Sequence, residues 1–144
     1  MNRDISLQLI EENPGNGEIL PFHYFDIMRG DVCVGKISLR FGDNFSSYYN
    51  GHVGFEVFPE YRGNNYAYRA MLLLLDIAKT HGINQIYLTC KKSNNASRRI
   101  FEKLNATFIE ETPIPRECFF YRPGIEDHVV YSLTLPVHRC NVGG

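Results

Sequence analysis

The chain has 144 residues, of which 44% are hydrophobic and 22% charged, and its formal net charge is −1. Length and composition suit one domain over residues 1–144, and the near-neutral charge gives no broad footprint for nucleic acid or acidic membranes. No apolar run approaches the roughly 20 residues of a membrane-spanning helix, and the polar N-terminus is unlike a signal peptide, so we expect a cytoplasmic protein.

Alternating apolar and polar residues predict three strands near the N-terminus, over 5–10, 22–29 and 32–41. Asn, Pro and Gly residues mark a loop over 11–17. Arg29-Gly30-Asp31 predicts a hairpin turn between the second and third strands. We expect one face of the third strand to carry Cys33, Gly35, Ile37, Leu39 and Phe41.

The middle of the chain is expected to alternate between strand and helix. A polar and aromatic loop over 42–50 leads to a fourth strand, 52–58, which Pro59 ends because it lacks a backbone N–H. Apolar residues at three- and four-residue spacing then predict a long helix over 65–81. Gly82 is expected to end this helix in the left-handed conformation.

A short parallel strand over 85–90 is expected next, and Ser93-Asn94-Asn95 begins a second helix that Asn105 ends. Strands over 107–111 and 129–135 should pair as an antiparallel hairpin. This order predicts an α/β (α+β) fold, with a mixed and mostly antiparallel sheet of about seven strands around a central strand–helix–strand–helix core. The apolar line expected for the second helix is Ala96, Ile100 and Leu104.

The segment Arg62-Gly63-Asn64-Asn65, between the fourth strand and the long helix, carries the first functional signal. Gly and Asn tolerate unusual backbone angles, and the free N–H groups at a helix start attract phosphate. With Arg62 beside them, the segment is a candidate pyrophosphate cradle. An ordinary connection with a solvated arginine is the alternative.

The stretch Pro59-Glu60-Tyr61-Arg62-Gly63-Asn64-Asn65-Tyr66-Ala67 resembles the acyl-coenzyme A loop of the Gcn5-related N-acetyltransferase (GNAT) superfamily. The family pattern is Arg or Gln, two residues, Gly, one residue, then Gly or Ala. Asn65 replaces the middle Gly, and Asn is the best other residue for left-handed backbone. The resemblance covers most of the chain and implies the family's fold with its early helices reduced. It also implies acetyl-CoA as cosubstrate and no metal, with the coenzyme held by Arg62, Gly63, Asn64, Asn65, Tyr66 and Ala67.

The second helix opens with another family feature. Asn94 corresponds to the residue that contacts the pantetheine arm of the coenzyme, and Ser97 to a small residue three positions later. Phe101 falls where many members carry a Tyr that protonates the departing thiolate, and Phe cannot donate a proton. Arg98 or Arg99 either contacts coenzyme phosphates or lies on a solvated helix face.

Acetyl transfer to an amine needs a group that removes a proton, because an alkyl amine with a pKa of about 10.4 is protonated at neutral pH. Glu56 on the fourth strand is the first candidate, and an exposed Glu paired with Lys or Arg is the alternative. His52 is the second candidate. The resemblance places the oxyanion at backbone N–H groups of this strand, those of Val57 and Phe58.

Other polar and aromatic residues have two interpretations each. Glu126 and Asp127 either attract a cationic amine or are solvated loop residues. Cys33 and Cys90 are either small buried side chains, which we favour, or catalytic thiols. The spacing of Cys33, Cys90, Cys118 and Cys140 does not support a zinc site. An aromatic substrate wall or simple packing are the alternatives for two loops with Tyr48, Tyr49, Phe119, Phe120 and Tyr121.

The sequence therefore predicts an enzyme that transfers an acetyl group from acetyl-CoA to a primary amine of a small molecule or peptide. The alternative is a catalytically weak acyl-CoA-binding sensor or regulatory domain, which Asn65 and Phe101 favour. A nucleic-acid-binding domain is opposed by the absence of a basic stripe. The resemblance also makes a homodimer possible.

Overall fold

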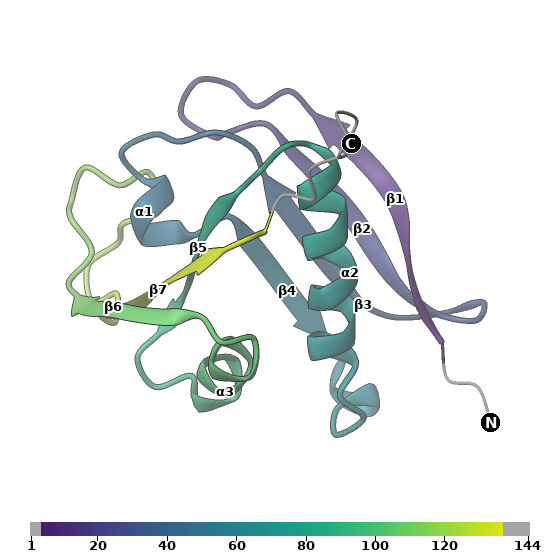
Figure 1. Cartoon of the computed structure of the whole chain (residues 1–144). Helices are drawn as coiled ribbons and strands as arrows, with labels where there is room; N and C mark the ends of the chain where they lie inside the picture. Colours follow the sequence, from purple (N-terminus) through teal and green to yellow (C-terminus); the bar gives the residue numbers. More distant parts are fainter. Residues whose placement is uncertain (1–3, 137–144) are drawn as a thin grey trace, which may run out of the picture.

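Figure 1 shows the chain in a computed structural model that describes residues 4–136, so Cys140 and the tail after Pro136 lie outside it. The strands are β1 (Ile5–Asn13), β2 (Phe22–Arg29), β3 (Val32–Arg40), β4 (Val53–Val57), β5 (Gln85–Lys91), β6 (Thr107–Thr112) and β7 (His128–Thr134). They form two sheets, ordered β1-β2-β3-β4 and β5-β7-β6, and every pairing is antiparallel. The predicted α+β fold with about seven mostly antiparallel strands is confirmed.

The first sheet is longer and less regular than the alternation predicted. β1 continues past Ile10 to Asn13, because the polar residues 11–13 still pair with β2 beyond a bulge. A second irregularity pairs Ile27 with Gly35 but Met28 with Cys33. This bulge places Val34 in the core and leaves Cys33 half-buried, so the prediction that Cys33 shares a face with Ile37 and Leu39 is wrong.

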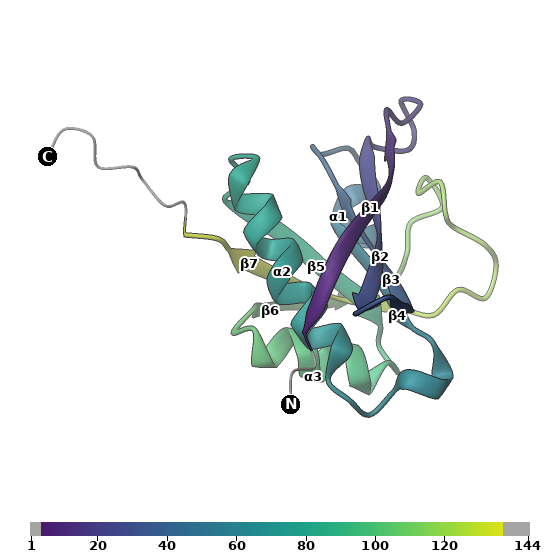
Figure 2. The same ribbon diagram turned by 90° about the vertical axis from the view of Figure 1, so that its right-hand side faces the viewer.

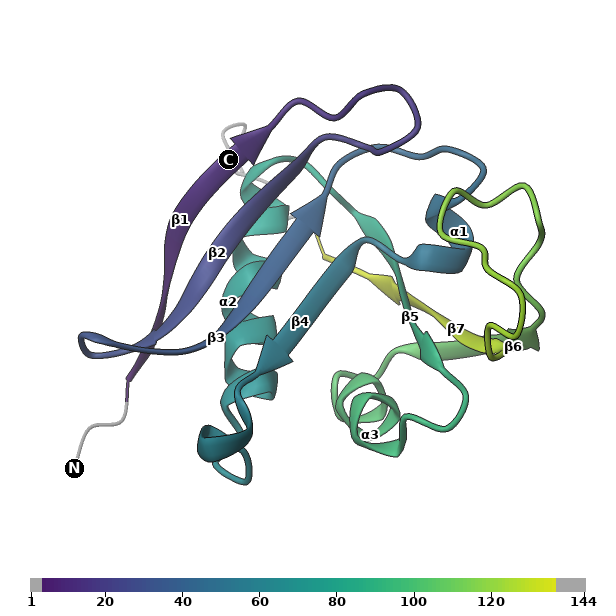
Figure 3. The same ribbon diagram turned by 180° about the vertical axis from the view of Figure 1, so that it is seen from behind.

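Helix α2 (Tyr66–Thr80) packs against one face of the four-stranded sheet (Figure 1). It ends as predicted: Gly82 has a φ of 77°, and the Ile83 N–H donates to the Ala78 carbonyl over 3.2 Å. The opposite face of this sheet has no helix over it within residues 4–136 (Figure 3). The fully buried side chains of α2 are Ala70, Met71, Leu74 and Ala78.

Two shorter helices complete the fold. α1 (Ser47–Asn50) lies inside the segment predicted as a loop. α3 (Asn95–Lys103) begins and ends close to the predicted residues, with Asn105 left-handed at a φ of 63°. Its buried face is centred on Ser97 and Phe101, whereas Ala96 of the predicted apolar line is exposed. The difference arises because Phe101 packs edge-on against Tyr131 of β7.

The two sheets meet at one point between β4 and β5, where the His52 N–H donates to the Tyr87 carbonyl over 2.9 Å. Below that point the two strands diverge, as Figure 3 shows, and no ladder joins them. The strand predicted as a parallel neighbour of β4 instead pairs with β7. One cluster of buried side chains nevertheless joins both sheets to α2 and α3.

Candidate active site

A cavity of about 420 Å³ opens where β4 ends and α2 begins, with α3 on its other side. Between β4 and α2 the chain makes a short 3-10 turn, η1 (Pro59–Tyr61), and the loop 62–65. Most of the residues that the sequence analysis proposed for the coenzyme come together here. The walls include Glu56, Val57, Arg62, Gly63, Asn65, Tyr66, Ala67, Asn94 and Ser97, together with Phe55, Tyr61, Tyr68, Ala96 and Ile100.

The start of α2 is bare. Asn65 occupies the cap position with a φ of 65° and makes no side-chain cap hydrogen bond. The prediction that Asn65 adopts left-handed backbone in place of Gly is thus confirmed. The first helical bond runs from the Arg69 N–H to the Asn65 carbonyl, so the N–H groups of residues 66–68 have no partner inside the helix.

Side chains around this helix start are held by neighbouring carbonyls. Arg62 Nε donates to the Val57 carbonyl over 2.9 Å, and Asn64 Nδ2 donates to the Tyr61 carbonyl over 3.0 Å. Asn64 is not on the cavity wall. These two bonds shape the loop and leave Arg62 exposed beside the helix start.

Two aromatic residues of α2 contribute differently. Tyr66 is only 4% exposed, and its hydroxyl accepts a hydrogen bond from Arg29 Nη1 over 3.1 Å, so its phenol already has a partner. Tyr68 lies on the cavity wall, and the Lys103 ammonium lies 4.2 Å from the centre of its ring. Lys103 Nζ is also 3.4 Å from Asn65 Oδ1, which puts a cation beside the bare helix start.

Lys103 was not among the residues predicted from the sequence. A lysine in the last turn of a helix complements the helix dipole, and nothing in its neighbours marks it as a ligand contact. Only the packing of the end of α3 against the start of α2 reveals its place.

The backbone of β4 offers free donors toward the cavity. The Phe58 N–H donates to the Val34 carbonyl over 2.9 Å, so the sequence-based role for this N–H is not available in the structure. Along an antiparallel ladder, the backbone N–H groups of successive residues point alternately toward the paired strand and away from it. Residues two or four positions before Phe58 therefore bond to β3, as Phe58 does. The N–H groups of Phe55 and Val57 therefore face the gap between the sheets, and neither donates to another described residue.

Glu56 lies exposed on β4 and forms part of the cavity wall. It faces Lys36 of β3 in the ladder, but Lys36 Nζ is bound to Asp26 at 2.6 Å. Among the described residues the Glu56 side chain therefore has no ion-pair or hydrogen-bond partner. A carboxylate that is free and open to the cavity suits a proton acceptor.

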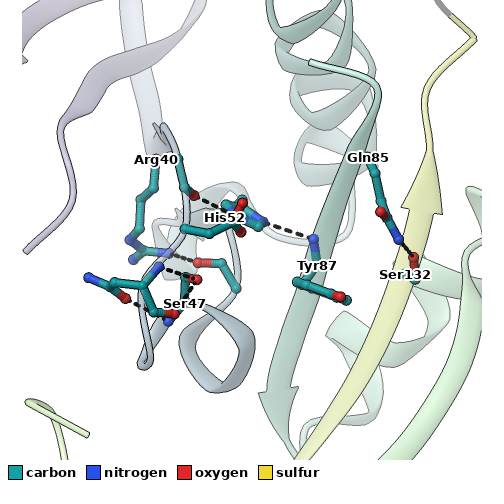
Figure 4. A network of polar contacts seen from close by, with 10 residues as sticks. Arg40, Ser47, His52, Gln85, Tyr87 and Ser132 are labelled. Atoms are coloured by element: carbon teal, nitrogen blue, oxygen red, sulfur yellow. Dashed lines mark hydrogen bonds and ion pairs between the residues drawn. The ribbon is translucent and has the colours of Figure 1, made fainter.

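His52 is 5% exposed and has both ring nitrogens occupied (Figure 4). Nδ1 accepts the Tyr87 N–H over 2.9 Å, which leaves the hydrogen on Nε2. Nε2 is 3.0 Å from the Gly42 carbonyl and 3.2 Å from Asp43 Oδ1. The imidazole thus takes the place of a ladder bond between β4 and β5, and the geometry gives it a structural role in place of the sequence-based catalytic one.

At the start of α3, Asn94 Oδ1 accepts the Ser97 N–H over 3.1 Å, and Asn94 lies on the cavity wall. Phe101 is 1% exposed and is not on that wall, so the structure does not support it as a coenzyme contact. Arg98 reaches the Tyr131 hydroxyl at 3.4 Å, and this hydrogen bond raises the pKa of Arg98. Arg99 is exposed.

The two aromatic loops pack on each other. The Phe119 N–H donates to Ser46 Oγ over 3.3 Å, and Tyr48 donates to Glu110 over 2.5 Å. Burial and this hydrogen bond raise the pKa of Tyr48 to about 12. Glu126 accepts the Ser93 N–H over 2.6 Å. These contacts favour the packing interpretation and give Glu126 a structural partner.

Several solved structures share this fold. A ribosomal L7/L12 alpha-N-protein acetyltransferase, solved with coenzyme A, superposes with a TM-score of 0.64 at 15% identity, covering 81% of this chain and 64% of its own. A Salmonella typhimurium protein, yncA, solved with its cofactor acetyl-CoA, superposes with a TM-score of 0.62 at 20% identity, covering 83% of this chain and 68% of its own. A GNAT-family acetyltransferase from Bacillus anthracis superposes with a TM-score of 0.60 at 22% identity, covering 77% of this chain and 65% of its own.

The chain belongs to the acetyltransferase (GNAT) family, whose profile matches residues 6–106. It spans between 64% and 68% of the length of the three solved structures. No curated protein matches it significantly. Among residues 4–136, no helix is long and apolar enough to cross a membrane.

Proposed function

We propose that the protein transfers an acetyl group from acetyl-CoA to a primary amine of a small molecule or peptide. The observation that carries this proposal is the bare start of α2 beside the open edge of β4. The start of α2 supplies N–H donors for an anion, and the edge of β4 supplies a row of N–H donors along an extended strand. Family membership and neighbours solved with coenzyme A or acetyl-CoA support the same cosubstrate.

The N–H groups of residues 66–68 would bind the pyrophosphate, with Lys103 and Arg62 supplying positive charge. Gly63 has a φ of 89°, and no described atom lies within 4 Å of the point that a Cβ would occupy there, so its backbone can approach a phosphate closely. The amide of Asn94 and the N–H group of Phe55 would hold the pantetheine arm between α3 and β4.

The chemistry then falls to Glu56 and Val57. Glu56 takes a proton from the ammonium group of the acceptor, and the free amine attacks the thioester carbonyl. The Val57 N–H, which faces the gap between the sheets, would donate to the oxygen that becomes negative. When the tetrahedral species collapses, the carbon–sulfur bond breaks, the thiolate leaves, and the new amide nitrogen loses its extra proton to solvent.

The test is to measure thiol release from acetyl-CoA across a panel of amines, together with coenzyme binding by calorimetry. For Glu56→Gln we expect kcat to fall by roughly 10²–10⁴-fold while coenzyme affinity is unchanged. Glu60→Gln is the matched control, since Glu60 is also exposed but lies outside the cavity wall. Equal loss in both variants, or none in Glu56→Gln, would remove Glu56 from the mechanism.

A sensor that binds acyl-CoA without efficient turnover is the second candidate. The observation that favours it is Phe101, whose buried ring leaves the role of thiolate acid without its usual side chain. Asn65, the second residue that favoured a sensor, no longer does so, because it adopts the left-handed backbone expected of the Gly it replaces. Tight coenzyme binding without thiol release for any amine would select the sensor.

A further inference from the structure

The face of the first sheet opposite α2 is the side from which an acceptor can reach Glu56. No described helix covers it, and the segment between β6 and β7 projects on that side (Figures 2 and 3). Side chains at alternate positions point to this face, so Gly54 and Glu56 share it. Lys36 also lies there but is neutralised by Asp26 at 2.6 Å.

Arg40, at the end of β3, is the second charged group beside this face without a charged partner. Its Nη1 donates to the Gly51 carbonyl over 2.9 Å, which fixes the guanidinium beside the start of β4 (Figure 4). No carboxylate among the described residues pairs with it. Burial lowers the pKa of Arg40, and no opposite charge offsets that effect.

Gly54 makes room for this arginine. A side-chain carbon built on Gly54 would lie 3.2 Å from Arg40 Nη2 and 3.3 Å from Ser38 Oγ. The guanidinium therefore rests against a strand position that carries no side chain. On its other side Arg40 meets a cavity of only about 20 Å³, space for about one water molecule. A ligand group would reach Arg40 from the Gly54 side.

We propose that the acceptor amine carries an anionic group, which Arg40 binds across Gly54 while Glu56 receives the amine. This inference rests on the proposed function and names its substrate class. Positions two apart on a strand are separated by about 7 Å, so the nitrogen and the anion lie on the order of 7 Å apart. Dipeptide-like and ω-amino carboxylates have this spacing, as do aminoalkyl phosphates. A half-buried guanidinium without a carboxylate partner suits such a group because its fork matches carboxylate or phosphate.

The test compares acceptors in pairs with the same amine and chain, in which one member carries the anionic group and the other has an uncharged group in its place. Glycylglycine is paired with glycylglycinamide, 5-aminopentanoate with pentylamine, and 4-aminobutyl phosphate with 4-aminobutanol. We expect kcat/KM for the wild-type protein to be at least tenfold higher for the anionic member of a pair. The first two pairs report a carboxylate and the third a phosphate, so the pair with the largest ratio identifies the anion.

Arg40→Gln should bring this ratio close to one by raising KM for the anionic acceptors, with coenzyme affinity unchanged. Lys36→Gln is the matched control: it removes a positive charge from the same face but should preserve the ratio. A ratio that drops equally in both variants would indicate general electrostatic attraction and overturn the assignment to Arg40.

The acceptor pairs assayed with the wild-type protein test the proposal even if Arg40→Gln does not fold. Equal kcat/KM for the members of every pair overturns this inference and leaves the proposed acetyl transfer intact. Absence of thiol release with every amine overturns the proposed function instead. The two failures are therefore distinguishable in one set of assays.

Discussion

The two principal helices both begin after an asparagine, and the two asparagines act in opposite ways. Asn94 has a φ of −83° and caps α3, with its Oδ1 accepting the Ser97 N–H over 3.1 Å. Asn65 has a φ of 65° and makes no cap bond to α2. One side chain satisfies its helix, and the other turns the chain so that the helix donors stay open.

The surroundings reinforce the difference. Just before α3, the Ser93 N–H and hydroxyl both donate to Glu126, at 2.6 and 3.0 Å. Beside α2 the neighbouring side chain is instead a cation, Lys103. An uncapped helix start costs stability. The arrangement is therefore best explained if an anionic ligand supplies the missing partner at α2, whereas α3 needs none.

Among substitutions at the two helix starts, Asn65→Val should cause the largest loss of coenzyme affinity. A β-branched residue in left-handed backbone costs roughly 1–3 kcal/mol, so either the protein loses stability or the loop shifts and opens the cradle. We expect coenzyme affinity to fall by about tenfold or more, measured by calorimetry, with a lower Tm. Asn65→Gly is the control and should bind as the wild type does. Unchanged affinity in Asn65→Val would show that the left-handed turn is not needed.

Asn94 should show a smaller effect and a separable one. Asn94→Ala removes the cap, with an expected loss of about 1 kcal/mol in the free energy of unfolding, measured with urea. Asn94→Asp keeps the cap but lacks the amide donor on the cavity wall, so stability should hold while coenzyme affinity falls. If Asn94→Asp binds coenzyme normally, the amide makes no contact with it.

The contrast also shows what the sequence can reveal. The extents of α2 and α3, the left-handed Asn65 and the end of α3 at Asn105 follow from local rules of propensity and capping. The free donors on β4 do not, because they depend on the register with β3, which assigns Phe55 rather than Phe58 to the open edge. The role of His52 depends on Tyr87, 35 positions away, and no local pattern encodes that contact.

Lys103→Gln tests whether charge adds to the open start of α2. Interactions of a charge with a helix terminus are worth roughly 0.3–1 kcal/mol, so coenzyme affinity should fall roughly two- to fivefold. The loss should shrink as salt rises, because exposed charges are screened. Lys79→Gln is the control, since Lys79 lies near Asp76 in the last turn of α2, at the far end from the cavity. A loss that does not change with salt would contradict an electrostatic role.

The smallest effect is expected at the closed helix start, from Glu126→Gln. Hydrogen bonds from Ser93 hold the pKa of Glu126 below its ordinary value of 4.5. A lowered folded-state pKa means that the ionised carboxylate stabilises the protein above pH 4.5, and that this contribution is lost as pH falls through the folded pKa.

The wild type should therefore have a slightly higher Tm than Glu126→Gln at pH 7, and the difference should vanish in acid. Coenzyme affinity should be the same in both, because Glu126 completes a start that needs no ligand. If Glu126→Gln weakened coenzyme binding as much as Lys103→Gln does, the two helix starts would not be independent. That result would contradict the distinction between the uncapped start of α2, which binds an anion, and the capped start of α3, which does not.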